Sequence, residues 1–112
     1  MVYDCEVYKN LFMLAFKHVK SGKSKSFEIF VDPDTEEVDS NFNVDEINWV
    51  FDNFEVVGFN TIKFDNPLIA MALAGRGTNA IKSAADNIIV DGKWVSDIEK
   101  MYGFKTIKPK HL

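Results

Sequence analysis

The chain contains little cysteine and little histidine: one Cys and two His among 112 residues. A single Cys excludes an internal disulfide framework and a Cys-rich zinc site. Two His residues also argue against a metal site built mainly from histidine. Any metal ion that the chain binds is therefore expected to have oxygen ligands, which favours Mg²⁺ or Mn²⁺.

The chain also lacks a long apolar run and an excess of basic residues. No apolar stretch reaches the roughly 18 residues of a membrane helix, and Asp4 and Glu6 interrupt the start of any signal peptide. The 13 Lys and Arg residues are outnumbered by 17 Asp and Glu, which gives a net charge of −4. This excludes a strongly basic nucleic-acid coat, but not a local basic patch or a nuclease that holds its substrate partly through metal ions. We expect a soluble, cytoplasmic protein with no membrane partner.

Apolar side chains, in contrast, are plentiful: 46% of the residues are hydrophobic and 10 are Phe. A chain of this length and composition can form one hydrophobic core. We therefore expect a single domain over residues 1–112.

Apolar and polar residues alternate over 1–8 and 26–31, and each of these segments predicts a strand. The nearly continuous apolar run over 11–19 predicts a well-buried strand between them. Their short connections predict an antiparallel meander. The acidic and polar stretch 36–43 predicts a loop, and Asn43 is expected to cap the helix that follows it.

A short β-branched run over 55–59 predicts a fourth, buried strand, followed by three helices. Asn66 and Thr78 are expected to cap the first two of these helices, and the third is expected over 95–102. Residues 104–107 are expected to begin a further strand. The order β-β-β-α-β-α-α-α predicts an α/β fold whose sheet is covered by the first helix.

Asp4 and Glu6 lie two residues apart in the first predicted strand, so their side chains are expected on the same face. Two neighbouring carboxylates in a sheet are costly unless a cation compensates them, and together they can reach one divalent ion. The alternative is that an edge strand exposes both to solvent and that the triplet arises by chance.

A second polar segment, residues 57–67, lies where the fourth predicted strand ends and a helix begins. Ligand sites in α/β sheets gather at the carboxyl ends of strands, so Asp65 is expected to face a metal across from the first strand. Asn60 is expected to fix the loop or to bind a substrate. The alternative for Asp65 is ordinary helix capping.

Together, Asp-x-Glu on the first strand and Asn-x-x-x-Phe-Asp after the fourth resemble the first two sequence blocks of the DEDD 3′–5′ exonucleases. Residues 3–10 (YDCEVYKN) and 58–67 (GFNTIKFDNP) are similar to the start of the exonuclease region in phage-encoded DNA polymerases. The resemblance implies a ribonuclease H-like mixed sheet with flanking helices. It also implies a phage or prophage protein that acts in a bacterial host cell.

In that family four acidic residues hold two divalent ions that promote phosphodiester hydrolysis in proofreading. The resemblance implies that Asp4, Glu6 and Asp65 are ligands of two Mg²⁺ or Mn²⁺ ions. It places Asn60 and Phe59 near the 3′-terminal nucleotide. The implied partners are a single-stranded DNA 3′ end and a polymerase domain in the same longer chain.

The family's third block, Tyr-x-x-x-Asp or His-x-x-x-x-Asp, is missing from the 112 residues. Tyr102 is followed four residues later by Thr106, and His18 five residues later by Lys23. That block supplies a general base and the fourth carboxylate. We therefore expect the chain to be the N-terminal part of a longer exonuclease domain, truncated at its C-terminus, and to be inactive or very weakly active alone.

Two other functions stay open: a non-catalytic ribonuclease H-like module that binds nucleic acid or a protein, and an exonuclease that acts on RNA. Lysines also surround the predicted turn between the second and third strands. They either contact a phosphate backbone or form a solvated turn, and the solvated turn is our expectation. Trp49 and Trp94 are expected in the core rather than as platforms for bases.

Overall fold

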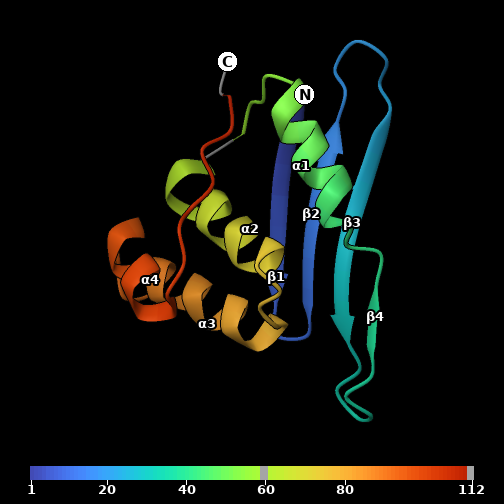
Figure 1. The fold of residues 1–112 in the computed structure, drawn as a ribbon. Helices are drawn as coiled ribbons and strands as arrows, with labels where there is room; N and C mark the ends of the chain where they lie inside the picture. The colour runs from blue at the N-terminus through green and yellow to red at the C-terminus, as the bar shows by residue number, and fades with distance from the viewer. Residues whose placement is uncertain (59–60, 111–112) are drawn as a thin grey trace.

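The computed structural model describes residues 1–58 and 61–110. Four antiparallel strands form one sheet in sequence order: β1 (Val2–Tyr8), β2 (Leu11–Lys17), β3 (Ser24–Val31) and β4 (Val38–Ser40). The helices are α1 (Val44–Asn53), α2 (Asn66–Leu73), α3 (Thr78–Ile89) and α4 (Val95–Tyr102), and a π-helix, η1 (Thr61–Asp65), directly precedes α2. The α/β class and the three-stranded meander are thus confirmed (Figure 1).

Alternation along the strands gives the sheet one apolar face. Tyr3 pairs with Phe16 and Cys5 with Leu14, and all four side chains are buried. On α1, the Phe51 ring packs edge-on against Tyr3 at 5.4 Å and against Phe16 at 5.3 Å, measured between ring centroids. Asp4 and Glu6, which alternate with the buried residues of β1, are exposed. The predicted covering of the sheet by the first helix is therefore confirmed.

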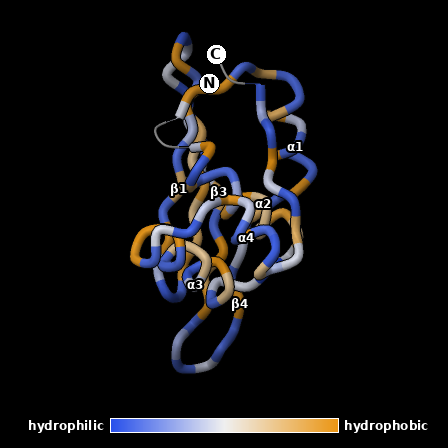
Figure 2. The backbone as a smooth tube through the Cα atoms, turned by 90° about the vertical axis from the view of Figure 1, so that its left-hand side faces the viewer, coloured by the Kyte–Doolittle hydropathy of each residue, from blue (hydrophilic) through white to orange (hydrophobic). Residues whose placement is uncertain are grey.

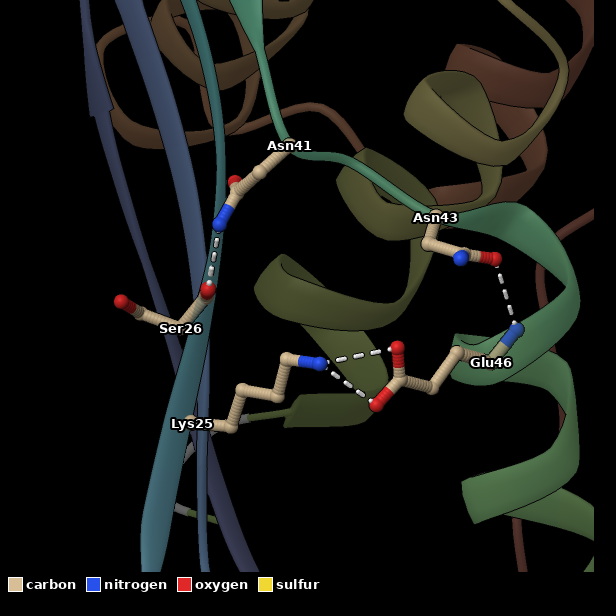
Figure 3. A network of polar contacts seen from close by, with 5 residues as sticks. All are labelled: Lys25, Ser26, Asn41, Asn43 and Glu46. Atoms are coloured by element: carbon tan, nitrogen blue, oxygen red, sulfur yellow. Dashed lines mark hydrogen bonds and ion pairs between the residues drawn. The ribbon is translucent and has the colours of Figure 1, made fainter.

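The start of α1 follows its sequence signal. Asn43 is the N-cap, and its Oδ1 accepts a hydrogen bond from the Glu46 backbone N–H at 3.0 Å. The Lys25 Nζ on β3 contacts both carboxylate oxygens of Glu46, at 2.7 and 2.9 Å. Figure 3 shows how this ion pair spans from the sheet to the first turn of α1.

The predicted loop over 36–43 is wrong in part, because it contains β4. This short strand pairs with β3, and the Asn41 side chain supports the pairing just beyond it. Asn41 Oδ1 accepts from the Glu28 N–H at 2.6 Å, and its Nδ2 donates to the Ser26 carbonyl at 3.1 Å. The loop between β3 and β4 is hydrophilic along its length (Figure 2).

Two predicted helix caps are wrong. Asn66 is the first residue of α2 and follows η1 without a break, since Asp65 already has helical dihedral angles. Gly77, not Thr78, is the N-cap of α3. Thr78 and Asn66 are buried instead.

The strand predicted over 55–59 is reduced to a single parallel bridge in which Val57 pairs with Val2 at the edge of β1. Val57 donates to the Met1 carbonyl at 2.9 Å and accepts from the Tyr3 N–H at 3.0 Å. On its other side, Val56 N–H donates to the Lys110 carbonyl at 2.8 Å. The predicted extension of 104–107 is not a strand, but its continuation thus reaches the Val56–Val57 segment.

A search of the described residues for a helix that is long and apolar enough to cross a bilayer finds none.

Candidate functional site

The candidate site lies at the edge of β1, where the Val56–Val57 segment leads into η1. Gly58 is needed there for close approach. A Cβ at this position would lie 2.0 Å from the Thr61 Cγ2 atom and 3.1 Å from the Tyr3 carbonyl oxygen. The absence of a side chain lets the start of η1 pack directly against β1. π-Helical turns are rare and are often found at functional sites.

Asp65, the last residue of η1, is only 3% exposed. It makes no side-chain capping bond to α2, so the helix-capping alternative is not what holds it. Its Oδ2 is buried and has no hydrogen-bond partner. A buried carboxylate oxygen without a partner is costly and is an observation that points to a missing ligand.

Burial, together with the nearby Asp4 carboxylate, raises the pKa of Asp65 to about 6. Hydrogen bonds from the Cys5 thiol and backbone act in the opposite direction. The structure therefore brings Asp4 and Asp65 together, although they are 61 positions apart in the sequence. At neutral pH two like charges meet here without a compensating cation among the described residues.

Two further polar side chains hold the start of α2 against β1. The Tyr3 hydroxyl donates to Asn66 Oδ1 at 2.6 Å, and both groups are buried. Burial raises the pKa of the Tyr3 hydroxyl, while a hydrogen bond with the Thr61 side chain lowers it. Tyr3, Thr61 and Asn66 were missed as site residues. The signal was present, because Tyr3 alternates with Asp4 on the strand and Thr61 and Asn66 flank Asp65.

The Cys5 thiol faces this buried cluster. Burial strongly raises its pKa, and the neighbouring Asp65 carboxylate adds to the effect. The thiol therefore stays protonated at neutral pH, which makes it a poor nucleophile and a poor metal ligand. Cys5 thus lies on the buried, apolar side of β1.

The other predicted site residues are Glu6, Phe59 and Asn60. Glu6 lies on the same exposed face of β1 as Asp4, and its Oε2 is 3.5 Å from the Tyr8 hydroxyl that donates to it. Within residues 1–58 and 61–110, no three His, Cys, Asp or Glu side chains are grouped closely enough to hold one metal ion. Phe59 and Asn60 lie outside the described residues.

Comparison of the chain with protein-family models, curated proteins and solved structures gives no match.

The donor set fits a hard divalent cation. Asp4 and Asp65 offer carboxylate oxygens, one of which is buried and unpartnered, and a bound Mg²⁺ or Mn²⁺ would offset the repulsion between them. The arrangement is thus suited to binding a metal ion at the surface of the sheet.

Proposed function

We propose that this chain supplies the first two acidic motifs of a metal-dependent 3′–5′ exonuclease domain with a ribonuclease H-like fold. The observation that carries the proposal is the meeting of Asp4 and the buried Asp65, whose Oδ2 has no partner. The parallel bridge between Val2 and Val57 supports it, since the resemblance implies a mixed sheet, which contains parallel as well as antiparallel pairing.

In this proposal Asp4, Glu6 and Asp65 bind the Mg²⁺ or Mn²⁺ ions. Bound ions of this kind lower the pKa of an attacking water and offset charge on the leaving 3′ oxygen. The chain's own residues set the geometry: Gly58 allows η1 to approach β1, and the Tyr3–Asn66 hydrogen bond fixes the start of α2. The Cys5 thiol stays neutral and adds no competing charge. The substrate is a single-stranded DNA 3′ end, in proofreading for a polymerase domain in the same longer chain.

A titration with Mn²⁺, followed by NMR of the backbone amides, tests the metal site directly. We expect selective broadening at residues 4–6 and 61–66 in the wild-type chain. Asp65→Asn should weaken Mn²⁺ binding tenfold or more, because second-shell changes alone cost 10- to 100-fold. Asp39→Asn, which changes an exposed carboxylate on β4, is the matched control and should leave the titration unchanged.

The missing third motif favours a second candidate, a non-catalytic module of the same fold that binds nucleic acid or a protein. The same titration separates the two candidates. If millimolar Mn²⁺ broadens no particular residues, or broadens them equally in Asp65→Asn, the exonuclease proposal is wrong. Nucleotide release from a single-stranded 3′ end by the 112 residues alone should be very weak, because the general base and fourth carboxylate are missing from them.

A further inference from the structure

An open pocket of about 560 Å³ lies between the turn that joins β2 to β3 and the C-terminal half of α1. This volume is within the range of about 300–1,000 Å³ that ligand sites occupy. None of Asp4, Glu6 and Asp65 lines it, so it is separate from the acidic site. Figure 1 shows the β2–β3 turn extending past the end of α1.

Aromatic rings form the interior of this pocket. Phe16 and Phe27 provide a buried floor at 4% and 1% exposure. Trp49 and Phe54 meet at 5.6 Å between ring centroids, with the ring planes 72° apart. Trp49 is 56% exposed, so the expectation of a core tryptophan is wrong. An exposed indole beside a pocket is available for stacking against a ligand.

The rim of the pocket is basic, and its shape is fixed by hydrogen bonds within the turn. The His18 N–H donates to the Lys23 carbonyl and the Gly22 N–H donates to the His18 carbonyl, each at 2.8 Å. Gly22 adopts a φ of 72°, which a glycine tolerates without strain. The turn therefore holds Lys23 at the rim, with Lys20 exposed beside it.

Glu46 is the only acidic side chain among the residues that line the pocket. Lys25 neutralises it through the two contacts that Figure 3 shows. Within the described residues, no salt bridge involves Lys17, Lys20 or Lys23. The positive charge at this end of the sheet is thus left for an external partner, although the whole chain is acidic.

From this arrangement we infer that the pocket binds a segment of single-stranded nucleic acid. One base stacks on Trp49, and Lys20 and Lys23 contact the phosphates that flank it. Aromatic rings next to a basic groove are how proteins bind single strands without sequence preference. A strand fits better than a free nucleotide because the lysines are spread around the whole turn. A duplex is disfavoured, since its bases are already stacked. The inference does not depend on the proposed exonuclease function.

Fluorescence anisotropy with a labelled oligo(dT) of about 12 nucleotides, a length within known single-strand footprints, tests this in the presence of EDTA. We expect binding at low salt that Trp49→Ala weakens about 5- to 100-fold, in line with the loss of one stacked base. Lys23→Gln should reduce the slope of log affinity against log salt by about 0.7, as for one lost phosphate contact. Glu46→Gln should tighten binding, because it removes the acidic side chain from the pocket.

Trp94→Ala is the matched control. Trp94 is also exposed, at 64%, and also lies near a lysine, since Lys63 Nζ is 4.4 Å from its ring centroid, but it does not line the pocket. Trp94→Ala should bind oligo(dT) as the wild type does. The EDTA in the assay keeps this test apart from the metal site, because it removes any metal-dependent contact.

Three results would overturn the inference. One is the absence of oligo(dT) binding at low salt, and another is equal binding by Trp49→Ala and the wild type. The third is binding of an abasic oligonucleotide or of poly-glutamate as tight as that of oligo(dT), which would indicate a site for polyanions or acidic peptides. Circular dichroism of each variant separates lost binding from lost folding.

Discussion

The β1–β2–β3 meander and the junction between β1 and η1 are both closely packed, but they bury different kinds of groups. The meander buries Phe12, Leu14 and Phe27, each 0–1% exposed. The junction buries Thr61, Asp65 and Asn66 at 2–4%, which are three of the four buried polar residues in the described part of the chain. Burial of apolar area stabilises by itself, whereas a buried polar group needs partners.

This difference determines how each region responds to change. In the meander, stability depends on volume and area, so its contribution is nearly independent of pH and of metal ions. In the junction, stability depends on individual groups: the Tyr3–Asn66 hydrogen bond and the protonation of Asp65. A site that is stabilised less than its surroundings is also one in which a ligand can add stability.

Asp65→Asn should have the largest effect and should raise stability at neutral pH. The folded pKa of Asp65, about 6, exceeds the ordinary aspartate value of 3.8, so the folded state binds more protons between these values. Wild-type stability should therefore fall as pH rises from about 4 to about 6, by at most about 3 kcal/mol. The Asp65→Asn variant should lack this loss of stability. Urea unfolding at pH 4 and pH 7 measures the difference.

Mg²⁺ should reverse the order of stability of the wild type and Asp65→Asn at pH 7. If the cation binds between Asp4 and Asp65, millimolar Mg²⁺ should stabilise the wild type at pH 7 and leave Asp65→Asn unchanged. A wild type whose stability is flat between pH 4 and pH 7 would show that Asp65 is not strained by its burial.

Gly58→Ala should destabilise the chain by about 2 kcal/mol, because the new methyl group overlaps Thr61 Cγ2 and approaches the Tyr3 carbonyl. The double variant with Thr61→Ser removes the closer obstacle and should recover part of the loss. Thermal unfolding of the single and double variants measures this coupling. An additive pair of effects would mean that the two positions do not clash.

The meander could be predicted from sequence because its signal is local. Tyr3, Cys5 and Val7 alternate with polar residues, and neighbouring strands pair through short turns. Asn43 was identified as a cap for the same reason, since the capping bond reaches only to Glu46. Local periodicity and capping are visible in the residues themselves.

The junction could be predicted only in outline. Asp4, Glu6 and Asp65 were predicted together as metal ligands, and the structure brings Asp4 and Asp65 together. The π-helix was not foreseen, since its start depends on packing of Thr61 and Gly58 against β1, which no local pattern encodes. Trp49 and Trp94 were wrongly placed in the core, because composition favours burial of tryptophan and says nothing of an open pocket.

Tyr3→Phe should destabilise the chain by about 1–2 kcal/mol, since it leaves the buried Asn66 Oδ1 without its 2.6 Å donor. Tyr8→Phe is the control on the same strand. Tyr8 is 56% exposed and its hydroxyl contacts Glu6 at 3.5 Å, so its change should stay within about 0.5 kcal/mol. Equal effects of the two variants would contradict the distinction between a buried polar junction and an exposed sheet face.

Glu46→Gln should have the smallest effect on stability. The Lys25–Glu46 pair has short contacts, but its side chains are 56% and 38% exposed, and such pairs contribute about 0–1 kcal/mol. Solvent and salt screen this pair, whereas they do not reach Asp65. The loss should therefore disappear in about 1 M NaCl, where the Debye length is about 3 Å, while the pH dependence caused by Asp65 should persist. Unfolding of Glu46→Gln and of Asp65→Asn at low and high salt compares a surface charge with a buried one. A loss of stability in Glu46→Gln that does not depend on salt would instead place the Lys25–Glu46 pair among the buried contacts that determine the structure.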